Sequence, residues 1–320
     1  MLFDTVLKKT SSLFAAILVM TSAWGMMHLP GANLQMVTFA LLGSSALCSV
    51  YDFKERIKLC TLITLEAAAA QFCLGITAEV LLVRIIVSTS CAFLILLYTP
   101  DRQLAVIALL TTYLALFAPA GFSDSLNRSI DLVFSGAVIL FISQIGNIFL
   151  SDSSKSEPRQ PYSLRESAII TAELTIGFII YTISKHEQFA WIIMSILFIH
   201  MAETPNKSLS ELTIQRITAT LFGILAGGIY LATFCSINYR MIYIVPITGT
   251  LSFFLLYLKN NYFIFTFLFM FTITIFSDWM LGAASRFNFT EVMFTRSTAT
   301  LIGGVLLLCG KNLMQKESVS

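Results

Sequence analysis

Charged side chains are scarce in this sequence. Asp, Glu, Lys and Arg make up 12% of its 320 residues, whereas 57% of the residues are hydrophobic. A soluble domain carries about 25% charged residues. There is no long basic run, and the net charge is only +2, so nothing indicates nucleic-acid binding. We therefore expect an all-α, polytopic membrane protein that lies in a lipid bilayer and binds no nucleic acid.

The motifs of several catalytic sites are also missing. There is no Walker A loop, no Gly-x-Ser-x-Gly and no His-Glu-x-x-His. The six cysteines form no Cys-x-x-Cys and have no histidine at metal spacing, so we interpret them as small buried hydrophobic residues. We expect no cofactor, no metal and no enzymatic activity. A membrane-embedded transferase is the least favoured alternative, with only His200 and Asp278 as candidate groups.

Apolar stretches, by contrast, are abundant. A spanning helix needs about 20 mostly apolar residues. With polar, proline and glycine breaks as loops, this rule predicts about twelve transmembrane helices. They cover residues 12–29, 34–51, 57–77, 80–98, 103–121, 128–150, 166–184, 188–203, 214–234, 241–258, 262–280 and 293–310.

The distribution of Lys and Arg predicts the orientation of these helices, because cytoplasmic loops carry an excess of cations. With the N-terminus inside, only six of the 20 Lys and Arg fall on the outer side. These are Arg84, Arg128, Lys185, Arg240, Arg286 and Arg296. We expect a multi-pass protein of a bacterial inner membrane with both termini in the cytoplasm.

A polar, proline-containing stretch at residues 151–163 is the only long linker. It separates a first module, residues 1–150, from a second, residues 164–320, and each module contains six predicted helices. Because an even number of spans returns the chain to the same side, we expect the two modules to be parallel repeats.

One octapeptide pattern, Arg-x-Thr-Ala-Thr-Leu-x-Gly, occurs twice in the second module, as Arg216-Ile-Thr-Ala-Thr-Leu-Phe-Gly223 and Arg296-Ser-Thr-Ala-Thr-Leu-Ile-Gly303, with six of eight positions identical. Small residues let helices approach closely in lipid, so we expect both helices to pack centrally and not to face lipid. Arg56 and Arg128 similarly open helices 3 and 6. An arginine at every third helix start suggests three-helix units in alternating orientation, as in transporters with inverted repeats.

The second module resembles the fusaric acid resistance family of inner-membrane proteins. The resemblance is carried by the Trp-led helix Trp191–His200, by Pro205 with the polar loop after it, and by the two octapeptides. It is best over residues 165–310. The chain departs from the family in having Ala219-Thr220 and Ala299-Thr300 where Gly-Thr is usual, and in having no room for a cytoplasmic domain between the modules.

The resemblance implies an export permease for small aromatic or amphipathic acids. It further implies that the proton gradient drives export and that a periplasmic membrane-fusion (adaptor) protein is the partner. Both departures leave substrate and regulation open.

Two carboxylates fall within predicted spans, Glu66 in helix 3 and Glu173 in helix 7. Ionisable groups in a membrane are costly and often functional, so both are proton-coupling candidates. The alternative for each is a hydrogen-bonded structural carboxyl. His200 and Glu203, three residues apart, could similarly form a proton relay or simply end a helix near water.

Three arginines are candidates for binding the substrate anion: Arg128, Arg216 and Arg296. A helix N-terminus would add positive charge at each position. Arg128 could instead pair with Asp131 on the same helix face. Arg216 and Arg296, expected at opposite mouths of one path, could instead anchor helices at lipid headgroups. We read Trp191 as an aromatic-belt residue and the phenylalanine run 263–276 as lipid-facing, with substrate stacking as the alternative.

The features together favour an inner-membrane permease that exports small organic anions, above all aromatic carboxylic acids. The alternative is a non-transporting component of an envelope or secretion complex, in which case Glu66 and Glu173 should tolerate replacement by Gln. Homo-oligomerisation stays open.

Overall fold

The fold is known from a computed structural model of the chain. It describes residues 2–27, 34–48, 50, 52–77, 80–117, 122–149, 160–202, 209–234, 238–257, 261–280 and 289–315. The linker prediction, residues 151–163, lies mostly outside these ranges.

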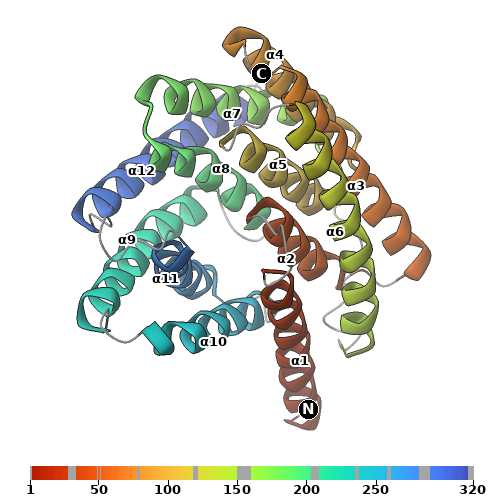
Figure 1. Cartoon of the computed structure of the whole chain (residues 1–320), viewed down its shortest axis with the longest axis vertical. Helices are drawn as coiled ribbons and strands as arrows, with labels where there is room; N and C mark the ends of the chain where they lie inside the picture. Colours follow the sequence, from red (N-terminus) through yellow and green to blue (C-terminus); the bar gives the residue numbers. More distant parts are fainter. Residues whose placement is uncertain are drawn as a thin grey trace.

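The described residues form twelve α-helices, which confirms the all-α class (Figure 1). The helices are α1 (Leu2–Met27), α2 (Leu34–Cys48), α3 (Phe53–Ile76), α4 (Leu81–Tyr98), α5 (Arg102–Phe117), α6 (Phe122–Phe149), α7 (Leu164–Ser184), α8 (Ala190–Ala202), α9 (Leu209–Phe234), α10 (Asn238–Tyr257), α11 (Tyr262–Met280) and α12 (Phe289–Gln315), with the 3₁₀ turn η2 (Glu187–Phe189) before α8.

Several helices begin earlier than expected. The starts of α6, α9 and α12 precede their apolar runs by four to six residues, because polar residues can continue a helix beyond its apolar part. As a result Arg128, Arg216 and Arg296 lie about two turns inside their helices. The prediction that an arginine opens every third helix is therefore right only for Arg56, in the first turn of α3.

Six helices are long and apolar enough to cross a membrane: α3, α4, α6, α7, α9 and α12. Within the described residues the other six contain shorter apolar stretches, so the count of twelve spans stays a prediction. The long helices expose apolar side chains to the outside, such as Leu82 on α4, Phe141 on α6 and Phe294 on α12. These surfaces are suited to contact with lipid.

The short helices α5 and α8 lie inside the bundle and pack against each other. Residues 104–113 of α5 and 192–201 of α8 are buried on every side. A helix that is hydrophobic all round is stable only when it is surrounded in this way. The first six helices and the last six occupy opposite sides of Figure 1, and besides the α5–α8 contact they meet where α1 packs on α10 and α4 on α7.

The repeated octapeptides lie at close helix contacts, but their helices are not central. Gly223 on α9 leaves room for the backbone of α11, where the Phe267 carbonyl oxygen would lie 2.7 Å from an added Cβ. Gly303 on α12 faces the Ile192 carbonyl of α8 in the same way, at 2.8 Å. The opposite faces expose Phe222 and Val305. The expectation of central packing is thus right for one face of each helix and wrong for the other.

Helices α9 and α12 run antiparallel. Gly304 on α12 lies against Thr213 and Ile217 of α9, and the Lys311 ammonium donates to the Ser210 hydroxyl at 2.8 Å. Moving forward along α12 therefore means moving back along α9. This direction is the one required by three-helix units of alternating orientation, which stay a hypothesis.

We predict that Gly223→Ala destabilises the protein by about 1–3 kcal/mol, because the added methyl group meets backbone and not a side chain that could move away. Thermal unfolding in detergent measures the change. Gly25→Ala is the matched control, since an added Cβ there meets nothing within 4 Å. Equal melting of the two variants would contradict the close packing.

Candidate functional site

Helix α8 brings together most of the residues that the sequence analysis singled out in the second module. Its side chains contact α7, α9, α11 and α12 from one short buried helix. Trp191 lies near its start, Ser195 in its middle, where it bonds Thr300 of α12, and His200 near its end. The Trp191–His200 segment is therefore the framework of the candidate site.

Arg216 is completely buried, with 0% of its surface exposed. Its guanidinium lies over the Phe198 ring, 4.8 Å from the centroid, and Nη2 is 3.8 Å from the Met270 sulfur. The Tyr262 side chain is close enough for an electrostatic interaction. Among the described residues no carboxylate lies within ion-pair distance, and Nε and Nη1 have no hydrogen-bond partner.

Aromatic rings surround this cation. Phe198 packs edge-on against Phe269 with centroids 5.0 Å apart, and Phe269 stacks on Phe265 at 5.7 Å. Tyr262 lies one turn before Phe265 and contacts it at 6.3 Å. The lipid-facing interpretation of the phenylalanine run is therefore wrong for Phe265 and Phe269, which are buried because α11 turns this face toward α8 and α9.

Arg296 is also buried, 4% exposed, and lies at the other end of α8. Its guanidinium covers the Trp191 ring at 4.9 Å, and Nε donates to the Gln188 side-chain oxygen at 2.6 Å. Trp191 is thus a partner of a buried cation, and its interpretation as an aromatic-belt residue stays a prediction. Because Trp191 and Phe198 are seven residues apart, the two arginines contact α8 about 10 Å apart along its axis.

Glu173 and His200 form a buried pair between α7 and α8. Glu173 Oε2 lies 3.2 Å from His200 Nε2, and the two side chains are 5% and 2% exposed. The relay predicted between His200 and Glu203 involves a residue outside the described ranges. The partner observed for His200 lies 27 residues away in sequence, so no local spacing could have indicated it.

The remaining candidates lie in the first six helices, away from α8. Glu66 is half-buried and accepts a hydrogen bond from the Thr99 hydroxyl at the end of α4, at 2.8 Å. Arg128 and Asp131 are both half-buried on α6. The site roles of Glu66 and Arg128 stay predictions.

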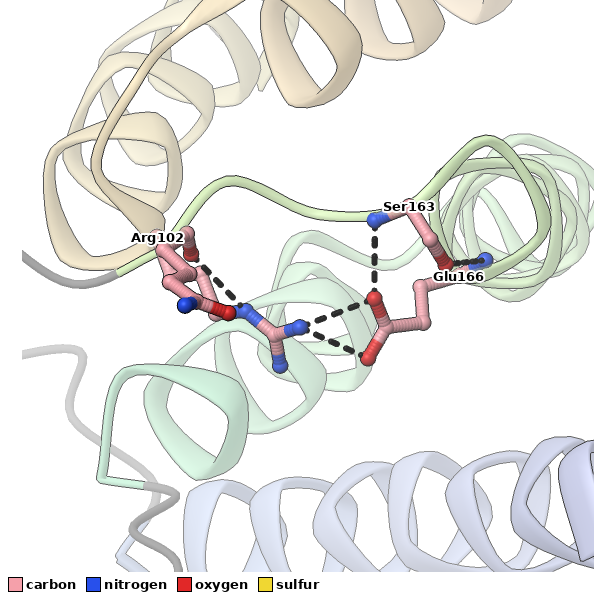
Figure 2. Close-up of polar contacts among 4 residues, drawn as sticks. Arg102, Ser163 and Glu166 are labelled. Atoms are coloured by element: carbon pink, nitrogen blue, oxygen red, sulfur yellow. Dashed lines mark hydrogen bonds and ion pairs between the residues drawn. The ribbon is translucent and has the colours of Figure 1, made fainter.

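Figure 2 shows the contact that connects the start of α5 to the start of α7. Arg102 Nη2 lies 2.8 Å from both carboxylate oxygens of Glu166, and Nε donates to the Gln160 carbonyl. Glu166 also accepts from the Ser163 backbone NH, and Ser163 Oγ accepts from the Glu166 backbone NH, which forms a capping box. The capping box fixes where α7 begins, and the Arg102–Glu166 ion pair holds this end against α5.

Tyr162 extends this junction toward the buried pair. The Arg102 guanidinium lies over its ring at 4.6 Å, and the ring meets His200 edge-on with centroids 6.4 Å apart. Sequence reasoning missed Tyr162, Gln188 and Tyr262, because each acquires its partner only when distant helices pack.

The apolar helices define a helical protein of the multi-pass membrane class. Residues 175–310 match the family model described as fusaric acid resistance protein-like, which confirms the resemblance seen in the sequence. The matched range includes Trp191, His200, Arg216 and Arg296. No curated protein and no solved structure matches the chain significantly. The family suggests a membrane transport or resistance protein.

We predict a coupling free energy of about 1 kcal/mol between Arg102 and Glu166, since both are partly buried and Nη2 contacts both carboxylate oxygens. A double-mutant cycle with Arg102→Ala and Glu166→Ala, measured by unfolding in detergent, gives this energy. The pair Lys58–Glu55 on α3 is the control and should couple more weakly, because its contact is longer, 3.6 Å, and its lysine is 68% exposed. A coupling of zero for Arg102 and Glu166 would show that the junction does not depend on this ion pair.

Proposed function

We propose that the protein is an inner-membrane permease that exports small organic anions, with aromatic carboxylates as the preferred class. The observation that carries the proposal is Arg216, a cation with no exposed surface and no carboxylate partner among the described residues. An unpaired charge is costly to bury, and the cost falls when an opposite charge and hydrogen bonds are supplied.

A substrate carboxylate would supply both the opposite charge and the hydrogen bonds. Its two oxygens match the fork of a guanidinium, and Arg216 has a nitrogen without a partner at each of two edges, Nε and Nη1, either of which forms such a fork together with Nη2. The rings of Phe198, Phe265 and Phe269 offer aromatic surface beside the charge. Since Arg216 lies two turns inside α9, beyond the reach of the helix dipole, the attraction comes from the guanidinium itself.

Arg296 is proposed as a second binding position on the same helix α8. Its guanidinium has the same environment in kind, a large aromatic ring on one face and burial around it. Two cationic positions about 10 Å apart along α8 would let an anion pass from one to the other.

We further propose that twelve spans form two six-helix repeats. Helix α3 packs on α6 as α9 packs on α12, and α2 on α6 as α8 on α12. The contact of α1 with α10 has its counterpart in that of α7 with α4. Helix α1 of the first repeat corresponds to α7 of the second, and α4 corresponds to α10. An approximate two-fold axis between the repeats would produce this pair of equivalent contacts. Both termini would then lie in the cytoplasm, as the Lys and Arg distribution favours.

Coupling to protons and to a periplasmic adaptor protein completes the proposal. Glu66 and Glu173 are the candidate proton carriers, as a carboxyl within a span can gain and lose a proton during a cycle.

We predict that Arg216→Gln lowers the efflux of labelled benzoate and related aromatic carboxylates from preloaded cells by about tenfold or more, because the buried counter-charge is lost. Arg216→Lys should retain part of the activity, since it keeps the charge but not the fork. Arg165→Gln, at an exposed position, is the control for substitution itself.

Efflux that is the same in Arg216→Gln and the native protein would remove Arg216 from the site. If the native protein exports none of these acids even with its adaptor co-expressed, the assembly-component alternative is favoured.

We also predict that a protonophore abolishes native efflux, because the export step is coupled to proton uptake. Glu66→Gln tests whether the first module carries a proton, with loss of protonophore-sensitive efflux expected. Efflux that survives collapse of the proton gradient would exclude proton coupling.

A further inference from the structure

The pair formed by Glu173 and His200 has one oxygen that the described part of the chain leaves without a donor. Oε2 faces His200 Nε2 at 3.2 Å, whereas Oε1 has no hydrogen-bond partner. Oε1 instead points at Gly310 of α12, where the position of an added Cβ would be occupied by the carboxylate oxygen. The absence of a side chain at residue 310 is what lets the carboxylate fit between α7 and α12.

Tyr162 covers the pair from the side of the α5–α7 junction. Its ring meets His200 edge-on at 6.4 Å and is itself covered by Arg102, which is held by Glu166. The other charged groups on the surrounding elements, among the described residues, are Asp101 before α5, Arg165 on α7, Glu211 and Arg216 on α9, and Arg296 and Lys311 on α12. None of these is within ion-pair distance of Glu173 among the described residues.

We infer that Glu173 and His200 together form one proton-binding site, and that this site couples proton movement to release of the anion at Arg216. The inference rests on the proposed function. It differs from a lone carboxyl carrier in that the histidine is part of the site, and in that α12 and Tyr162 control access to it.

The charge on the pair explains why proton binding would depend on conformation. With one shared proton the pair is neutral overall, either as carboxyl and imidazole or as carboxylate and imidazolium. Removal of that proton leaves a single negative charge, and burial disfavours a charge without a partner. The pair therefore exchanges its proton only when it reaches water, which requires α12 to move away from Oε1 or Tyr162 to move off His200.

Helix α8 connects the two sites. His200 is two residues from Phe198, whose ring lies under Arg216. The two side chains contact different neighbours, α7 for His200 and α9 for Phe198. A shift or rotation of α8 that exposes the pair also moves the ring away from the guanidinium, so proton binding from the outer side and release of the anion become one movement, as export coupled to proton uptake requires.

The first test uses the full-length protein in vesicles of phosphatidylethanolamine and phosphatidylglycerol, with labelled benzoate as the probe. Glu173→Gln and His200→Gln should each lower transport driven by a pH gradient by about tenfold or more, because each breaks a buried pair. Exchange of benzoate at equal pH needs no net proton transfer and should fall less. Glu211→Gln, a glutamate at an exposed position of α9, is the control.

Equal loss of driven transport and exchange in both variants would overturn the coupling role, since it would mark the pair as structural. Arg216→Gln should lose both activities, which separates the anion site from the proton site. If wild-type vesicles move no benzoate at all, the proposed function fails for this probe, and the second test decides whether the pair binds a proton.

The second test needs no substrate. The chain has only three histidines, so the ring signal of His200 in ¹⁵N-histidine-labelled protein is identified by its absence in His200→Gln. Glu173→Gln should change the pH dependence of this signal, because the group nearest to the ring is replaced by one that cannot titrate. Gly310→Ala should also change it by displacing the carboxylate, without replacing either titrating group, whereas Gly25→Ala should not. A pH dependence unaffected by Glu173→Gln and Gly310→Ala would overturn the inference.

Discussion

The burial of positive charge among aromatic rings is the constraint on which the second half of this protein depends. Arg216 lies over Phe198 and Arg296 over Trp191, and both guanidinium groups are shielded from the outside. Cation–π contact offsets part of the cost of removing a charge from water, but it supplies no neutralising charge. The aromatic positions of α8 and α11 are thus fixed by the arginines that they cover.

Helix α8 transmits this constraint to the rest of the bundle. Its thirteen residues are too few for a comfortable span, yet it is surrounded on every side by longer helices. It therefore needs no polar face, and each of its sides contacts a different neighbouring helix. Arginine contacts at both ends, the Ser195–Thr300 bond in the middle and the His200–Glu173 pair all arise from this position.

The class of the fold was predictable from composition and hydropathy alone, and the helices could be placed within a few residues at most ends. The predicted starts of α9 and α12 are too late, because an apolar run indicates the part of a helix that is suited to lipid and not the residue at which the helix begins. The buried arginines could be singled out because the octapeptide repeats around them. Their partners Phe198, Gln188 and Tyr262 could not be predicted from the sequence. Packing decides which helices face each other, and the local spacing of residues does not indicate it. Glu173 and His200 were each chosen as candidates, but only the three-dimensional arrangement joins them.

The glycine contacts at residues 223 and 303 make two of the helix pairs in the second half more rigid than the contact between them. At Gly223 helix α9 meets the backbone of α11, and at Gly303 helix α12 meets the backbone of α8, so neither pair can slide without a collision. Between α9 and α12, by contrast, side chains such as Ile217 lie at the contact and can change rotamer. The second half thus consists of two rigid helix pairs, α9 with α11 and α8 with α12, which are joined by the more adaptable contact between α9 and α12. Arg216 belongs to the α9–α11 pair and Phe198 to the α8–α12 pair. The distance between the guanidinium and the ring therefore reports any relative movement of the two helix pairs.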